Sequence, residues 1–232
     1  MTFQADLINK VVGIASDSWT VTAGRVVPDV TALPFANQGK TLSACILYAD
    51  LSNSTEMVNN TPRERAAEYY KAFLYCASRL IELNQGTVEA YDGDRVMGVF
   101  LGVEKEERAV RASFQLKLAM DTIVNGVFER TYPGTHKDLQ YTVGIDTGQV
   151  MACKAGVRGT SELVWVGPAA NYAAKLNSFP ELDHRYPTRI TEAVFSALSA
   201  WTFNNSGLSV WEGPWERNGV RHYRSLANTQ LP

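Results

Sequence analysis

A β-hairpin is the feature that most constrains how this chain can fold. Two short runs of strand-forming residues, Thr87–Tyr91 and Val96–Leu101, flank the four residues Asp92–Arg95, whose sequence is DGDR. Asp and Gly tolerate the backbone angles of a tight turn, and an Asp-Gly pair between two such runs is a strong hairpin signal. The sequence therefore predicts two antiparallel strands, with Asp94 in the turn that joins them.

A second aspartate lies at the end of another predicted strand. Ser43–Leu51 (SACILYADL) is a short apolar run typical of a buried strand, and it places Asp50 near the polar edge of a sheet. The segment Asn53–Asn60 that follows is expected to be a loop. Three further runs predict strands, namely Leu139–Asp146, Gly148–Ala155 and Leu163–Val166.

Apolar residues at helical spacing predict helices between these strands. A capping-box pattern, Thr61 followed by Glu64, predicts the start of a helix that runs to about Asn84. Further helices are predicted over Glu104–Asn125 and Gly167–Asn177. Because strands and helices mix without strict alternation, the expected fold class is α+β, with helices packed on a mixed sheet.

The bulk composition limits the domain organisation and the partners. The length of 232 residues and the apolar content of 45% allow one large domain, and residues 1–40, which lack a sustained period, are expected to be an N-terminal extension to a domain at 41–232. The net charge of −2 and the absence of a long basic run argue against binding to nucleic acid or an anionic membrane. Three cysteines without metal-ligand spacing, and no signal-peptide pattern, predict a cytoplasmic location.

The two aspartates together suggest a metal site. An aspartate at a strand end or in a turn is commonly only a solvated cap, so neither Asp50 nor Asp94 carries the hypothesis alone. A strand and a neighbouring hairpin can bring both carboxylates to one edge of one sheet. Mg²⁺ and Mn²⁺ prefer such oxygen ligands and keep substrate phosphates in their coordination shell. The sequence therefore predicts two divalent metal ions as cofactors, Mn²⁺ or Mg²⁺, at this edge.

Four segments resemble the motifs of class III adenylate and guanylate cyclases. CILYADLSNST is similar to their "FADI-x-GFT", and VEAYDGDRVMGVF is similar to "VEKTIGDGVMAVF". YTVGIDTGQVMA is similar to "RIGIHTGxVxAG", and VWVGPAANYAAKLN to "xxIGxxVNxAARL". The segments keep the family's order and spacing over residues 43–177. The resemblance implies a ferredoxin-like cyclase fold with a mixed, mainly antiparallel sheet, a catalytic domain at 41–232, and a head-to-tail homodimer with composite active sites.

The resemblance also implies a role for each matching residue. Asp50, Asp94 and the backbone carbonyl of Leu51 would hold the metals that act on a nucleoside triphosphate. The residues expected to bind the triphosphate are Asn53, Ser54 and Thr55, with Arg217 or Arg221 as a further phosphate ligand. Asn171 would orient the ribose from the partner protomer, and Lys175 takes the place of the family's transition-state arginine.

The departures from the family concentrate where the purine base is bound. Ala90 replaces the base-reading Lys or Glu four residues before Asp94, and Val164 occupies the second base-reading position. Ser54 replaces the Phe of "GFT", and Arg95 replaces the Gly after the metal Asp. A site that discriminates strongly between bases needs hydrogen-bonding groups, which Ala90 and Val164 lack. A selective purine cyclase of the ordinary design is therefore not expected.

The segment Tyr91–Arg95 resembles the pyrimidine cyclases of bacterial Pycsar antiphage systems, which make cyclic UMP or cyclic CMP. The resemblance implies a UTP substrate, with CTP less favoured, and a separate effector that binds the cyclic nucleotide. Tyr48, Tyr91 and Arg95 are candidate donors to the base carbonyls. Two alternatives stay open: a purine or relaxed cyclase, and a catalytically silent nucleotide-binding or dimerisation module.

Overall fold

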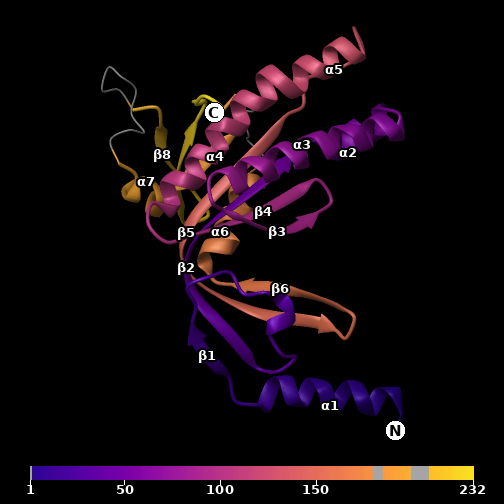
Figure 1. The fold of residues 1–232 in the computed structure, drawn as a ribbon, viewed down its shortest axis with the longest axis vertical. Coiled ribbons are helices and arrows are strands. Elements are labelled where there is room, and N and C mark those ends of the chain that lie inside the picture. The colour runs from indigo at the N-terminus through magenta and orange to yellow at the C-terminus, as the bar shows by residue number, and fades with distance from the viewer. Residues whose placement is uncertain (1, 180–184, 200–208) are drawn as a thin grey trace.

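The computed structural model describes residues 2–179, 185–199 and 209–232. It shows one sheet with the strand order β3-β4-β2-β5-β7-β9-β8, while β1 pairs with β2 and β6 pairs with β5 (Figure 1). The strands are β1 (Thr20–Ala23), β2 (Gln38–Leu51), β3 (Thr87–Asp92), β4 (Arg95–Leu101), β5 (Tyr141–Val157), β6 (Thr160–Val166), β7 (Thr188–Thr191), β8 (Glu212–Arg217) and β9 (Val220–Ser225). This mixed sheet with packed helices confirms the predicted α+β class.

The helices flank this sheet on both faces. They are α1 (Phe3–Ser16), α2 (Ser54–Asn60), α3 (Arg63–Leu83), α4 (Lys105–Ala119), α5 (Asn125–Thr131), α6 (Pro168–Asn177) and α7 (Glu192–Ala197), with a 3₁₀ turn η1 (Val30–Ala32) and a π-helical turn η2 (Met120–Val124). Among the described residues, no helix combines the length and the apolar character that crossing a membrane requires.

Strands β2 and β5 form the centre of the sheet and separate two cores. Their antiparallel register runs from Gly39 opposite Cys153 to Leu51 opposite Tyr141. Side chains alternate along β2, so Cys45, Leu47 and Ala49 enter a large core under α3 and α4. The alternate residues, Leu42, Ala44 and Ile46, enter a smaller core with Ala169 and Ala173 of α6. Asp50 is separated from Ile46 by an even number of positions along β2. It therefore points to the same face as Ile46, which is the face that α6 covers.

Several boundaries differ from the expectations of the sequence. Asn53–Asn60 is mostly helix α2 rather than loop, and Asn53 precedes it with a left-handed φ of 55°. The predicted capping box is wrong, because Pro62 occupies the cap position of α3 and none of the described side chains caps that end. The predicted break before Gly148 is also wrong, since β5 continues through it while pairing with β2.

The first 40 residues form helix α1 and also add a strand to the sheet. Thr20–Ala23 of β1 pairs in parallel with Gln38–Thr41 at the start of β2. Helix α1 contains no buried residue, and Figure 1 places it at the end of the molecule opposite the C-terminus. Its exposed apolar side chains include Phe3, Ile8 and Val11.

Helix α6 contacts the sheet closely at a glycine. A Cβ atom built on Gly144 would lie 2.1 Å from the carbonyl oxygen of Ala173, which is far inside van der Waals contact. Gly144→Ala is therefore expected to push α6 off β5 and to lower the free energy of unfolding by at least about 1–3 kcal/mol. Gly148→Ala is the matched control, because its nearest neighbour would be 3.7 Å away. Equal thermal unfolding midpoints for the two variants would contradict this account.

Candidate active site

The register between β2 and β4 places Asp50 directly opposite Arg95. The Arg95 guanidinium donates to one oxygen of Asp50, Oδ2, from Nη2 at 2.7 Å and from Nε at 3.1 Å. Both side chains are partly exposed, 19% for Asp50 and 31% for Arg95. Burial raises the pKa of Asp50, Arg95 opposes that rise, and the nearby charges of Asp94 and Asp92 add to it. The edge therefore gathers three carboxylates around one cation.

Asp94 lies in the turn between β3 and β4, as predicted. Its Oδ2 atom is buried and has no hydrogen-bond partner among the described residues. A buried carboxylate oxygen without a partner is costly unless a cation satisfies it, and oxygen donors are what Mg²⁺ and Mn²⁺ prefer. Asp50 and Asp94 therefore fit a divalent ion that takes its other ligands from substrate and water. Within residues 2–179, 185–199 and 209–232, no three His, Cys, Asp or Glu side chains form a metal-binding group.

The residues predicted to bind the triphosphate follow β2 directly. The Leu51 side chain is buried in the large core, so only its main chain is available at the edge. Asn53 is exposed and its side chain caps nothing, and Ser54 and Thr55 form the first turn of α2. The β2–α2 junction thus presents one amide and two hydroxyl side chains beside Asp50.

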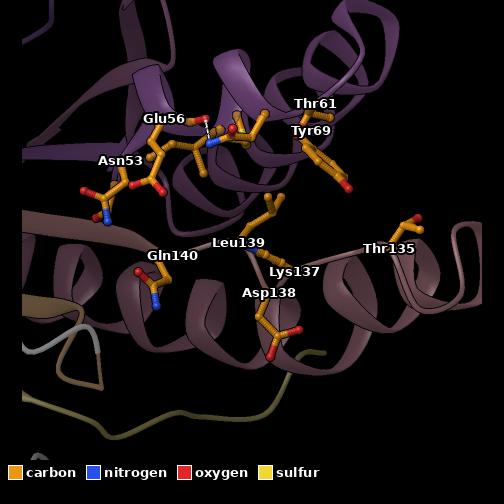
Figure 2. Close-up of a pocket in the computed structure, with 13 residues that line it drawn as sticks. Asn53, Glu56, Thr61, Tyr69, Thr135, Lys137, Asp138, Leu139 and Gln140 are labelled. Carbon is orange, nitrogen blue, oxygen red and sulfur yellow. Dashed lines mark hydrogen bonds between the residues drawn. The ribbon is translucent and has the colours of Figure 1, made fainter.

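A pocket of about 290 Å³ lies at this junction. Figure 2 shows Asn53 and Glu56 on one wall, facing Lys137, Asp138 and Gln140 from the segment before β5. Asn53 belongs to both the pocket and the candidate phosphate loop, whereas Asp50 and Asp94 do not line the pocket. The pocket therefore adjoins the candidate metal edge through Leu51, which lines it, without including either aspartate.

Helix α6 presents the two residues predicted to act across a dimer. Asn171 and Lys175 are both exposed, and their spacing of four residues places them on one side of the helix. The opposite side is buried through Ala169, Ala173 and Leu176. In the described part of the chain, no hydrogen bond or ion pair connects Asn171 or Lys175 to the aspartates, so these residues face outward from a single protomer.

The candidate base contacts on β2 and β3 divide between the two faces of the sheet. Tyr48 and Ala90 pack against the smaller core, and the Tyr48 hydroxyl donates to the Met97 sulfur at 3.2 Å, a weak acceptor. Tyr91 points to the other face, where its hydroxyl lies 2.8 Å from that of Ser78 on α3. The structure therefore separates Tyr91 from Tyr48.

Val164 on β6 also faces away from the smaller core. It is 43% exposed, and its neighbour Trp165 packs against that core instead. Alternation along a strand makes this inevitable, because successive side chains point to opposite faces. Trp165, which sequence reasoning did not select, therefore shares a face with Tyr48 and Ala90.

The two candidate phosphate arginines have different surroundings. Arg221 forms an ion pair with Glu192 at 2.6 Å. Arg217 lines a pocket of about 310 Å³ together with Arg189, His222 and Arg224. Sequence reasoning missed Arg189 and Arg224; the period of two along β9, which puts His222 and Arg224 on one face, was the signal available. Glu216 lines the same pocket, and its three arginines outnumber that carboxylate, which supports Arg217 as a candidate anion ligand.

Comparison with known proteins identifies the class that this fold and this site define. Residues 37–219 match the family model for the adenylate and guanylate cyclase catalytic domain. The chain belongs to this family, whose domains act on nucleoside triphosphates and generally use divalent metal ions.

Two similar relatives carry a narrower name. A protein of Xanthomonas perforans named Uridylate cyclase is 42% identical over 200 residues, covering 86% of this chain and 85% of the relative. A protein of Burkholderia cepacia with the same name is 38% identical over 225 residues, covering 95% and 96%.

Solved cyclase structures share the fold. The adenylyl cyclase CyaB from P. aeruginosa aligns with a TM-score of 0.68 at 18% identity, covering 83% of this chain and 97% of that one. The guanylyl cyclase Cya2 aligns with a TM-score of 0.67 at 18% identity, covering 84% and 96%. The predicted class III cyclase fold is thereby confirmed.

Proposed function

We propose that this chain converts UTP, and less readily CTP, to the 3′,5′-cyclic monophosphate and pyrophosphate. The observation that carries the proposal is the sheet edge where Asp50 lies beside Asp94, whose buried Oδ2 has no hydrogen-bond partner among the described residues. The pyrimidine base is supported by the relatives named Uridylate cyclase at 38–42% identity over most of the chain. Apolar Ala90, where the purine enzymes carry a charged base reader, supports the same assignment.

Two divalent ions, Mg²⁺ or Mn²⁺, would be held by Asp50, Asp94 and the backbone carbonyl of Leu51. Bound there, they would supply Lewis acidity to the ribose 3′-hydroxyl and neutralise charge on the phosphates. Asp50 must release Arg95 from Oδ2 to use that oxygen as a ligand. The freed guanidinium would then lie at the same edge, where it and the Tyr48 hydroxyl can donate to the carbonyl oxygens of the base.

The remaining residues would hold and polarise the triphosphate. Asn53, Ser54 and Thr55 donate from the β2–α2 junction, and Asn171 and Lys175 reach the site from a second copy of the chain. The ribose 3′-hydroxyl loses its proton to water and its oxygen forms a bond to the α-phosphorus, while the bond from that phosphorus to the bridging oxygen of pyrophosphate breaks. Lys175 meets the charge that builds on the α-phosphate, and Arg217 holds the departing phosphates.

The homodimer is part of this proposal because one protomer exposes both halves of the site at different places. Asn171 and Lys175 face outward on α6, whereas Asp94 lies in the β3–β4 turn, with Asp50 beside it on β2. A head-to-tail pair of copies would bring each half against the other and create two composite sites. The product would act in the cytoplasm as a second messenger of antiphage defence, read by a separate cyclic-nucleotide-binding effector.

Incubation of the purified chain with each of the four ribonucleoside triphosphates and Mn²⁺ tests this function. We expect cyclic UMP as the main product by mass spectrometry, with a smaller yield of cyclic CMP. Cyclic AMP or cyclic GMP as the main product would show a purine cyclase instead. No product from any nucleotide, with an intact fold, would show a silent binding module.

A further inference from the structure

The hairpin that carries Asp94 contains an irregularity that changes which side chains face the smaller core. Between the pairs Val88–Gly98 and Ala90–Met97, β3 advances two residues while β4 advances one. Glu89 is therefore the extra residue of a β-bulge. A bulge redirects the side chain that a regular strand would point to the other face, and bulges are frequent beside active sites.

The redirected Glu89 side chain meets strand β6. Its carboxylate is half-buried, and burial raises the pKa of Glu89 while the neighbouring Trp165 N–H partly offsets the rise. Trp165 packs on the smaller core together with Tyr48 and Ala90. Figure 1 shows the β3–β4 hairpin and β6 extending toward the same side of the molecule. Glu89 thus lies between the hairpin and β6, on the face that carries Tyr48.

This carboxylate has unused capacity to accept hydrogen bonds. Among the described residues, no lysine or arginine forms an ion pair with Glu89. The indole Nε1 of Trp165 is buried and meets no acceptor in hydrogen-bond geometry within the described chain, although it lies near Glu89. A half-buried carboxylate with one imperfect donor is costly. A ligand that brings an N–H group to Glu89 would offset part of that cost.

We propose that Glu89 is a specificity-determining residue that accepts the N3–H of uracil, with Trp165 as the residue that positions its carboxylate. The inference rests on the proposed uridylate cyclase function. Uracil presents one donor, N3–H, between two carbonyl oxygens, and an ionised carboxylate is an acceptor only, so the two groups are complementary. Glu89 and Trp165 each lie one residue from the apolar positions Ala90 and Val164. The bulge on β3 and the alternation on β6 bring these polar neighbours to the base-facing side.

UTP and N3-methyl-UTP, which lacks the N3–H, test the contact directly. The wild-type chain should prefer UTP by at least roughly 100-fold in kcat/KM, because a site built to bond an N–H rejects the analogue without it. Glu89→Ala should lose roughly 10- to 100-fold of kcat/KM for UTP but little for N3-methyl-UTP, so that the preference collapses. Glu89→Gln keeps an acceptor oxygen, so its preference for UTP over N3-methyl-UTP should lie between those of the wild type and Glu89→Ala.

Trp165→Phe tests the positioning role, since it keeps an aromatic side chain and removes the indole N–H. It should reduce the preference for UTP over N3-methyl-UTP by several-fold without changing turnover of the methylated analogue. The matched control is Glu162→Gln, an exposed carboxylate on the same strand β6, which should leave both rates unchanged.

The outcomes separate this inference from the function on which it rests. If the wild-type chain makes cyclic UMP but Glu89→Ala and Glu89→Gln keep the full preference, the inference fails and the function stands. Equal losses for both nucleotides in Glu89→Gln would show a structural role and overturn the inference. Wild-type turnover of N3-methyl-UTP as fast as UTP would overturn it too. If the wild-type chain cyclises no nucleotide, both the proposed function and the inference about Glu89 are refuted.

Discussion

Asp94→Asn is expected to reduce UTP turnover by roughly 1,000-fold or more while the protein stays as stable as the wild type. In the proposed site Asp94 holds a divalent ion, and losing about 4 kcal/mol of charge stabilisation in the transition state gives a rate loss of this size. Stability should be kept because the buried Oδ2 of Asp94 makes no hydrogen bond within the part of the chain that the structure describes. Turnover by mass spectrometry and thermal unfolding of the same samples measure both effects.

The controls for Asp94→Asn come from the same edge of the sheet. Asp92→Asn removes an exposed carboxylate of the same hairpin, whose charge also acts on Asp50, and should retain most of the activity. Asp50→Asn should also abolish turnover, but it weakens the ion pair with Arg95 and is therefore less clean. Substantial activity in Asp94→Asn would refute the two-metal proposal, as would equal losses in Asp92→Asn and Asp94→Asn.

The second large effect is expected when two inactive variants are mixed. Asp94→Asn and Asn171→Ala should each be nearly inactive, because each damages both sites of a homodimer. In a head-to-tail heterodimer the two changes fall in one site, and the other site regains both Asp94 and Asn171. After subunit exchange at equal amounts, half of the dimers are heterodimers with one intact site of two. The mixture should recover about a quarter of the wild-type activity.

A mixture of Asp50→Asn with Asp94→Asn is the matched negative control. Both residues belong to the same half of the site, so each heterodimer site still contains one of the two changes, and no recovery is expected. Recovery in this control would show that Asp50 and Asp94 of one site come from different chains, and would refute their assignment to the same half. Failure of the Asp94→Asn and Asn171→Ala mixture, once exchange is demonstrated with differently tagged chains, would refute the proposed dimer.

Local sequence signals were sufficient for the parts of the fold that carry the candidate site. The apolar run ending at Asp50, the DGDR turn around Asp94 and the helix with Asn171 all form as predicted, because each depends on residues that are close in sequence. The same local approach misjudged Asn53–Asn60, where helix α2 forms although Asn and Ser are common in loops. It also broke β5 at Gly148, where pairing with β2 keeps the strand extended.

The features that the sequence could not show depend on strand register. Arg95 meets Asp50 across 45 positions of sequence because β4 aligns with β2 in one register and not another. A register shift of one residue between β2 and β4 would leave the Asp50 and Arg95 side chains on opposite faces of the sheet. The bulge at Glu89 is likewise a property of the pairing between β3 and β4. No local pattern encodes either feature, although each decides which charged groups share the site.

The ion pair between Arg95 and Asp50 makes metal and nucleotide binding thermodynamically linked in the proposed enzyme. A divalent ion that takes Oδ2 of Asp50 must displace the guanidinium. The apparent metal affinity is then the intrinsic affinity multiplied by the fraction of molecules in which the pair is open. A nucleotide that accepts hydrogen bonds from Arg95 opens its ion pair with Asp50 and so tightens metal binding. Reciprocity then requires the metal to tighten nucleotide binding by the same factor. Without substrate, the site would discriminate against metal ions that arrive alone, and the metal–nucleotide complex would be the species that it selects.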